Sequence, residues 1–587
     1  MSTVLLKIHH GNDFITLKAN KGMNLLNILK DFDVAPESPC GGMGKCGKCL
    51  VYCFPNSAFS KITASEAKQL SNKKINLGAR LACQTSVIND GEVYFVPHKQ
   101  SDIFEIDKDF SVKEFEPFLR TEYLSLPKKI DENDITAEIR KSLNNEELDF
   151  SRIISVPESL NKEIAVKRSG EMVVSISNSE QKRNVGVAVD LGTTTIVVAM
   201  VDLNNGKIID THSCLNPQRS FGADVISRIS YIIGSEKGLE ELNKKIIDCI
   251  NNMVEKIAYE SDLSKYSIDQ YIVSGNTTMI HILFSLPVNT IARSPYVPFT
   301  NSCLKREASL LGLAGQSYTQ VYSFPSISAF VGGDIVSGIL ASKLYESTSC
   351  MFVDLGTNGE LVYINEDKIY CCSTAAGPAF EGANISCGTG NVDGAIYKVN
   401  INKNDFELHT INTEEPSGIC GTGIISLVAE LIKYKLVEKN GSFSINKDHS
   451  DKIRSKFDLS KKRLYLTEEI FISQKDIRNF QLAKAAIKTG YDLLVKLAGN
   501  IKPDLIYVAG GFGSSLNPED VFTVGMIPEK SENKLKPLGN TSLKGAIKLM
   551  LKRNSLNSIN YIISNSLPID LSSMKNFRKE YVSNLSF

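Results

Sequence analysis

Hydrophobic and polar positions alternate in two short runs at the start of the chain, which predicts a β-hairpin over residues 2–9 and 13–19. Apolar residues then recur at helical spacing, so residues 23–32 are expected to form a short helix. The further elements expected here are a strand, a capped helix and a strand, at residues 49–54, 62–71 and 91–97. Short strands around a helix are typical of an α+β domain of the β-grasp type, which we assign to residues 1–97.

The next part of the chain divides into a linker and a small domain. Residues 98–117 are polar and show no sustained period, so they are expected to form a linker that lets the first domain move. Residues 118–180 are expected to form a small middle domain. Its expected elements are one capped helix, at 134–143, and two strands, at 163–169 and 171–177.

Residues 181–587 have the pattern of one large α/β unit that contains an internal repeat. The sequence Val-Asp-Leu-Gly-Thr occurs twice, and its aspartates, Asp190 and Asp354, are 164 positions apart. Each copy is followed later by a strand that ends in a glycine turn, at 271–278 and at 506–515. Two matched pairs in the same order indicate a duplication, with two related halves and a cleft between them. The predicted fold is therefore multidomain, α+β followed by α/β.

Composition narrows the classes of protein that fit this organisation. The 587 residues are 42% hydrophobic and 22% charged, which excludes a mainly disordered chain. Lys+Arg and Asp+Glu are equal at 66 each, which disfavours a nucleic-acid partner. We find no apolar run long enough to span a membrane and no signal-peptide pattern, so a cytoplasmic protein is expected.

A cysteine cluster in the first domain carries the first candidate chemistry. Cys40, Cys46 and Cys49 have the spacing C-x5-C-x2-C, and Cys83 supplies a fourth thiol. Four thiolates are the usual ligands of a [2Fe–2S] cluster, and the x5-x2 spacing resembles that of adrenodoxin-like ferredoxins. A structural zinc site usually has two C-x2-C pairs, and a [4Fe–4S] site usually has C-x2-C-x2-C. Cys53 is expected to be a core residue of its strand.

The two repeated turns carry the second candidate chemistry. Successive backbone N–H groups after Gly192 and Gly356 could form anion-binding nests. Asp190 and Asp354 could hold Mg²⁺ through water or orient an attacking water. The candidate ATP-binding residues of these turns are Gly192, Thr193, Thr194, Thr195, Gly356, Thr357 and Asn358. The sequence contains no P-loop, and four later cysteines (Cys371, Cys372, Cys387 and Cys420) are expected to be packed thiols rather than a second cluster.

This large unit resembles the superfamily of actin, the heat-shock chaperone ATPases and the sugar kinases, in which two related halves close on ATP. The resemblance implies a first phosphate loop at 186–195, a second at 352–360 and an adenosine motif at 508–516. In that motif the base would lie against Gly510, Gly511 and Gly513. Two segments, 417–424 and 539–546, resemble the hinge-side connecting helices of that fold.

A [2Fe–2S] domain ahead of such an ATPase, together with GNTTM, FVGGD and GPAFEGANISCGTG, resembles the reductive activators of corrinoid proteins. The resemblance implies ATP-dependent one-electron reduction of Co(II) to Co(I) on the corrinoid protein of a methyltransferase system. It also implies an upstream low-potential electron donor and a homodimer. Glu381, within GPAFEG, could polarise water, contact the partner or cap a turn.

Two other functions remain open at this point. One is activation of a different low-potential enzyme, as in the dehydratase and benzoyl-CoA reductase systems, whose activators hold a [4Fe–4S] cluster between two subunits. The other is a redox-sensing ATPase or chaperone without net electron delivery. A sugar kinase fits least well, because it needs no ferredoxin domain.

Overall fold

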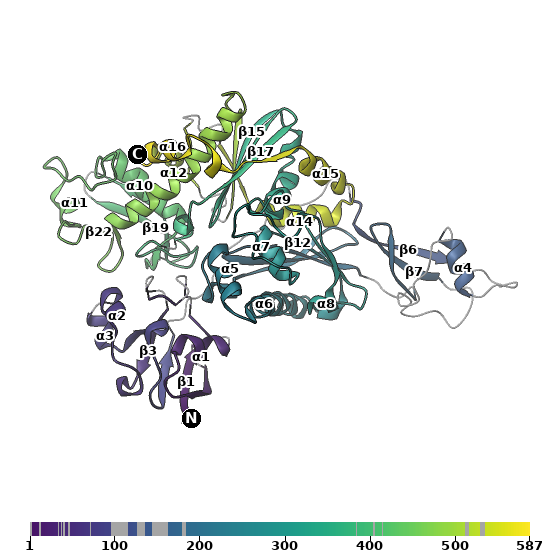
Figure 1. The fold of residues 1–587 in the computed structure, drawn as a ribbon, viewed down its shortest axis with the longest axis horizontal. Coiled ribbons are helices and arrows are strands. Elements are labelled where there is room, and N and C mark those ends of the chain that lie inside the picture. The colour runs from purple at the N-terminus through teal and green to yellow at the C-terminus, as the bar shows by residue number, and fades with distance from the viewer. Residues whose placement is uncertain are drawn as a thin grey trace.

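The protein is described here from a computed structural model. It describes residues 3–10, 13–32, 34–36, 38, 42–44, 47, 49–70, 72–95, 115–125, 135–143, 163–178, 183–382, 384–402, 405–413, 415–510, 516–528 and 535–587. The predicted linker lies almost entirely outside these ranges. Two lobes occupy the centre of the molecule, with a ferredoxin-like unit below them and a small three-stranded sheet at the far end (Figure 1).

The N-terminal unit is a five-stranded sheet in the order β2-β1-β5-β3-β4. The first two strands pair as the predicted antiparallel hairpin, and β5 pairs parallel to β1, which gives the β-grasp arrangement. The strands are β1 (Thr3–His10), β2 (Asp13–Asn20), β3 (Leu50–Phe54), β4 (Ala79–Leu81) and β5 (Gly91–Tyr94). The helices are α1 (Leu25–Asp31), α2 (Ala64–Gln69) and α3 (Asn72–Asn76).

The small middle domain is built on a three-stranded antiparallel sheet in the order β6-β7-β8. Its elements are β6 (Leu119–Ser125), α4 (Ile135–Ser142), β7 (Glu163–Ser169) and β8 (Met172–Asn178). The predicted helix and both predicted strands are present, whereas β6 was not predicted. A buried ion pair ties this sheet to the first lobe, because Lys167 Nζ lies 2.5 Å from Asp269 Oδ1.

The first lobe has a six-stranded sheet in the order β11-β10-β9-β12-β14-β13. Its strands are β9 (Val185–Leu191), β10 (Thr195–Asp202), β11 (Ile208–Leu215), β12 (Ile268–Gly275), β13 (Lys305–Glu307) and β14 (Gln320–Ser323). Its helices are α5 (Val225–Gly234), α6 (Gly238–Glu260), α7 (Thr277–Leu283), α8 (Ala308–Leu311) and α9 (Gly333–Ser342).

The second lobe repeats this plan with a six-stranded sheet in the order β25-β24-β15-β16-β17-β26. Its strands are β15 (Ser349–Leu355), β16 (Gly359–Asn365), β17 (Lys368–Thr374), β24 (Leu505–Gly510), β25 (Leu535–Gly539) and β26 (Ser566–Pro568). Its helices are α10 (Gly421–Lys433), α11 (Asp451–Ser455), α12 (Gln474–Leu497), α13 (Pro518–Thr523), α14 (Thr541–Leu551), α15 (Ser555–Asn565) and α16 (Phe577–Ser583). Two small three-stranded sheets complete it, formed by β18 (Ala395–Ile401), β19 (Phe406–Thr410) and β20 (Gly418–Ile419), and by β21 (Phe457–Asp458), β22 (Arg463–Tyr465) and β23 (Phe471–Ser473).

Strand register shows that the two lobes are structural repeats. In the first lobe β9 and β10 form a hairpin, and β12 runs parallel to β9 with Ser274 beside Asp190. In the second lobe β15 and β16 form a hairpin, and β24 runs parallel to β15 with Ala509 beside Asp354. The two repeated aspartates therefore occupy equivalent positions, each at the end of a central strand. This confirms the duplicated actin-like fold expected from the sequence.

The lobes are joined by two closely packed helices, α9 and α14. A methyl group on Gly545 would overlap the carbonyl of Ser337, and one on Gly338 would lie 2.9 Å from Phe352 and from Thr541 Oγ1. Glycine at both positions lets the two helix backbones approach. The segment 539–546 was rightly assigned to a connecting helix, but its partner is α9. The helix that begins in 417–424, α10, packs on β18 and α13 instead.

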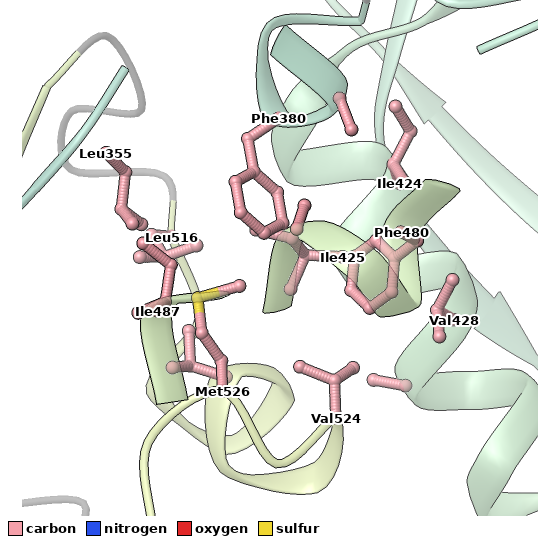
Figure 2. Packing of buried hydrophobic residues seen from close by; sticks show 14 of the residues in the cluster. Leu355, Phe380, Ile424, Ile425, Val428, Phe480, Ile487, Leu516, Val524 and Met526 are labelled. Carbon is pink, nitrogen blue, oxygen red and sulfur yellow. The ribbon is translucent and has the colours of Figure 1, made fainter. Parts of the chain in front are cut away.

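The core of the second lobe lies between its large sheet and α10 and α12. Figure 2 shows this packing, in which Phe380 and Phe480 face each other among aliphatic side chains. Their rings meet edge to face with centroids 5.7 Å apart. Phe380 precedes Glu381, so this aromatic contact fixes the backbone that carries Glu381 into the cleft.

Candidate active site

A cleft of about 1270 Å³ opens between the two lobes. It is lined by every described residue that the sequence assigned to nucleotide binding or catalysis, namely Asp190, Gly192, Thr193, Thr194, Thr195, Asp354, Gly356, Thr357, Asn358, Glu381 and Gly510. Gly511 and Gly513 lie outside the described residues. The cleft is the place where the sequence motifs of both lobes converge.

The predicted first phosphate loop, between β9 and β10, is held by three side chains. Asn216 Nδ2 donates to the carbonyl of Gly192 at 2.8 Å, and Arg228 Nη2 donates to the carbonyl of Thr193 at 2.5 Å. Asn276 Nδ2 donates to Thr193 Oγ1 at 2.9 Å. Two of these bonds occupy loop carbonyls and one occupies a threonine hydroxyl, so together they fix the conformation in which the loop could present N–H groups to an anion.

Arg228 supports the loop through its hydrogen bonds and its charge, and it was not identified from the sequence. Its guanidinium is fully buried and also donates to Gln218 Oε1 and to the carbonyl of Gly222. A buried cation behind the loop favours a bound phosphate by its charge. No local sequence signal marks it, because Arg228 lies on α5, far from the Asp-Leu-Gly-Thr motif.

Glu381 connects the phosphate loops of the two lobes. Thr194 Oγ1 and Thr357 Oγ1 both donate to Glu381 Oε2 at 2.8 Å, and the two hydroxyls lie 3.0 Å apart. Burial raises the pKa of Glu381, and the two hydroxyl donors partly counter that rise. Glu381 Oε2 thus accepts hydrogen bonds from two threonine hydroxyls that the sequence analysis predicted to bind phosphate.

Four carboxyl groups gather at the floor of the cleft. Asp190 accepts from Asn540 Nδ2 at 2.8 Å and from Ser542 Oγ at 2.7 Å, so it is tied to the start of α14. Burial and the neighbouring carboxylates raise the pKa of Asp354 to about 8, and burial is the main reason that the pKa of Asp334 rises to about 7. Burial also raises the pKa of Glu360 well above its usual range.

Asp334 and Glu360 are site residues that the sequence analysis did not assign. Both were within reach of sequence reasoning, because Asp334 ends the quoted FVGGD segment and Glu360 directly follows the DLGTNG turn. Like-charged groups buried together disfavour the ionised state, and a divalent cation would relieve that cost. The donor set, which is made only of oxygen, fits Mg²⁺.

Two of the four cysteines that the sequence predicts as cluster ligands lie within the described residues. Cys49 and Cys83 are buried, and their sulfurs lie 3.3 Å apart. Gln84 Nε2 donates to Cys83 Sγ at 3.7 Å and to the carbonyl of Gly42, which fixes the cysteine loop. Cys40 and Cys46 lie outside the described residues. Two adjacent thiols held by an amide donor fit one side of an iron–sulfur cluster.

Cys53 and the four cysteines of the second lobe that the sequence analysis considered behave as packed thiols. Cys53 is fully buried in the β-grasp core, where burial raises its pKa to about 12. Cys371 and Cys372 lie in two different hydrophobic cores, on opposite faces of β17. Cys387 accepts from the backbone N–H of Phe471, and Cys420 donates to the carbonyl of Ile396. These contacts agree with the expectation that the four later cysteines are packed thiols.

The ferredoxin unit lies at the mouth of the nucleotide cleft. Lys30, at the end of α1, stacks its ammonium over the ring of Phe221 in the first lobe at 4.7 Å. Burial lowers the pKa of Lys30. Residues Pro36, Gly47 and Gln69 of the ferredoxin unit line the cleft together with both phosphate loops. The face of this unit that carries Pro36, Gly47 and Gln69 is therefore turned toward the two lobes, below which the unit lies in Figure 1.

Three family models match consecutive parts of the chain. They are a 2Fe-2S iron-sulfur cluster binding domain over residues 9–87, the RACo middle region over 185–347 and the C-terminal domain of RACo, the ASKHA domain, over 348–587. The chain belongs to the RACo family. The RACo middle region coincides with the first lobe, so the small sheet at 118–180 lies outside the matched ranges.

Two curated proteins and one solved structure are similar to this chain over most of its length. The chain is 28% identical to the corrinoid activation enzyme RamQ of Eubacterium limosum, over 93% of both chains. It is 25% identical to a [Co(II) methylated amine-specific corrinoid protein] reductase of Methanosarcina barkeri, over 64% of this chain and 71% of that one. Among solved structures, it is similar to a reductive activator for a corrinoid, iron–sulfur protein, with a TM-score of 0.72, 29% identity and coverage of 100% and 98%. Within the described residues, no helix is both long and apolar enough to cross a membrane.

Proposed function

We propose that this protein is an ATP-dependent reductive activator that delivers one electron to the Co(II) corrinoid of a partner protein and yields Co(I). The observation that carries the proposal is that the ferredoxin unit, through residues that include Gly47 between Cys46 and Cys49, lines one cleft together with both predicted phosphate loops. The named activities of the relatives support the same reaction. No corrinoid-binding motif occurs in the sequence, so we place the cobalt on the partner.

The energetics explain why ATP is needed. A ferredoxin-type [2Fe–2S] cluster supplies single electrons at about −400 mV. Each ~59 mV of an uphill one-electron transfer costs about 1.4 kcal/mol. Closure of the two lobes on ATP can offset several kcal/mol if the closed form binds one cobalt state preferentially. Thr194 and Thr357, one from each lobe, already touch across the cleft, so they mark the place where the two lobes would meet around a phosphate.

For each ATP-site residue we choose one of the roles that the sequence left open. The loops at Gly192–Thr195 and Gly356–Asn358 bind phosphates through backbone N–H groups and hydroxyls, and Gly510, Gly511 and Gly513 receive the adenosine. Asp190 and Asp354 hold the Mg²⁺ of the nucleotide, which neutralises phosphate charge when bound. Glu381 gives up the two threonine hydroxyls to phosphate and then orients the attacking water. Cys40, Cys46, Cys49 and Cys83 hold the cluster.

The test is anaerobic visible absorbance of Co(II) methyltransferase corrinoid proteins, mixed with this protein and a low-potential reductant, with and without Mg-ATP. We expect the Co(I) band only when ATP is present. Cys83→Ser should abolish it, whereas Cys53→Ala, in the same domain, should not. Asp354→Asn should abolish it, whereas Asp448→Asn, at an exposed position of the same lobe, should not.

The result also separates the alternatives. If the cluster is intact and ATP is hydrolysed but no corrinoid partner yields Co(I), the reductive activity is refuted. A redox-sensing ATPase or an activator of another low-potential enzyme would then fit better. We further propose a cytoplasmic homodimer that receives electrons from a separate low-potential donor. Size-exclusion chromatography with light scattering tests the dimer.

A further inference from the structure

A second pair of thiols, besides Cys49 and Cys83, lies in contact within the first lobe. Cys214 on β11 and Cys249 on α6 have their sulfurs 2.7 Å apart. The two residues are 35 positions apart in the sequence and lie on neighbouring elements, where the helix covers the edge strand of the sheet. Neither residue lines the nucleotide cleft or belongs to the proposed cluster ligands.

The surroundings favour a bond between these sulfurs. A disulfide has an S–S distance of about 2.05 Å, so the two sulfurs need to move by less than about 1 Å. Both side chains pack against the apolar core of the first lobe, which holds them in place. Both residues are also only partly buried, which leaves a small oxidant access.

We propose that Cys214 and Cys249 are an oxidative modification site that forms a reversible intramolecular disulfide with hydrogen peroxide. The hydrogen bond to Cys214, together with burial, raises the pKa of Cys249. The thiolate of one of the two cysteines attacks the O–O bond and becomes a sulfenic acid, and the released hydroxide takes up a proton to form water. The sulfur of the other cysteine then displaces the sulfenic oxygen, which leaves as a second water.

The overall step balances. Two thiols lose two protons and two electrons, and one hydrogen peroxide accepts them to give two waters. A dithiol such as dithiothreitol reverses the bond by exchange. The disulfide would join α6 to β11 two residues before Asn216, whose amide holds the first phosphate loop at Gly192. The site is therefore placed to fix the back of that loop against α6.

The experiment uses the full chain with its cluster. The protein is treated anaerobically with increasing hydrogen peroxide, quenched with iodoacetamide, digested and analysed by mass spectrometry. We expect a linked peptide pair containing Cys214 and Cys249, two hydrogens lighter than the sum of the free peptides. Dithiothreitol should remove it, and more than about 90% of the signal should be lost in Cys214→Ser and in Cys249→Ser. Cys303→Ser, which changes an exposed cysteine of the same lobe, should retain it.

The wild-type result alone decides the proposal, so it does not depend on how the variants fold. The proposal is overturned if both thiols are still alkylated at peroxide doses that already oxidise Cys303. It is also overturned if Cys214 is found linked to any other cysteine, or linked between two chains. Persistence of the linked pair after dithiothreitol would refute its reversibility.

Discussion

Replacement of Asp354 by asparagine should stabilise the protein in the absence of nucleotide while it abolishes function. Burial and the carboxylates of Asp334, Asp190 and Glu381 raise the pKa of Asp354 from 3.8 to about 8. Between these two pH values the folded state keeps a proton that the unfolded state has lost. The stability of the wild-type protein therefore falls as pH rises through this window and levels off above about pH 8.

The expected size follows from the shift. A pKa unit corresponds to about 1.4 kcal/mol, so a shift of four units would equal about 5–6 kcal/mol. Water in the cleft weakens the electrostatic cost of an ionised carboxyl, and the coupled carboxyls share the cost of their mutual repulsion. We therefore expect the single substitution to raise the free energy of unfolding by about 1–3 kcal/mol. Asparagine keeps the shape of the side chain and cannot ionise, so the gain should be largest at high pH.

Differential scanning calorimetry of nucleotide-free protein between pH 5 and pH 8.5 measures this effect. The melting temperature of the ATPase unit in Asp354→Asn should exceed that of the wild type by a few degrees at pH 8.5, and the difference should shrink toward pH 5. Asp448→Asn should show no such dependence. Equal or lower melting temperatures for Asp354→Asn at pH 8.5 would refute the argument that the carboxyl is strained in the empty cleft.

Other substitutions test the packing that positions the site. Gly545→Ala should push α14 away from α9, which should lower the free energy of unfolding by about 1–3 kcal/mol and also lower the ATPase rate. Gly234→Ala should change neither quantity, because no atom lies within 4 Å of its added Cβ. Urea unfolding measures the stability, and phosphate release measures the ATPase rate. Lys167→Met should cost about 3–5 kcal/mol in thermal unfolding, because it leaves Asp269 buried without its cation. Arg80→Met should cost a similar amount in the ferredoxin unit, and loss of visible cluster absorbance on heating should report it.

Much of the fold could be predicted because its signals are local. The hairpin at the N-terminus follows from alternation, and the repeat of Asp190 and Asp354 follows from five identical residues. The strand β6 was missed because its pairing partner, β7, lies about 40 positions later, so no short-range pattern announces it. The same reason explains the wrong partner for α14, since packing with α9 depends on glycines more than 200 positions apart.

In the candidate site, too, residues in local motifs were predicted and residues brought in from other elements were not. Residues inside the repeated motif were found, since glycines, threonines and aspartates at this fixed spacing are typical of a phosphate-binding turn. Arg228 and Asn216 were missed because they serve the loop from other elements and carry no motif of their own. Asn276 lies in the quoted GNTTM segment, but the sequence analysis assigned it no role at the loop. Asp334 and Glu360 stood beside recognised motifs, yet only the fold shows that they share one cleft with Asp354.

Repulsion among the clustered carboxyls can be linked to the position of the ferredoxin unit. Closure on a phosphate–cation pair would remove their mutual repulsion, so binding energy becomes available to draw the two loops together. The ferredoxin unit contacts the first lobe through Lys30 and Phe221. A movement of the first lobe toward the second must therefore either carry this unit along or break that contact. If the contact holds, closure of the cleft moves the ferredoxin unit together with the first lobe, and this movement would supply the coupling that the proposed ATP-dependent electron delivery needs.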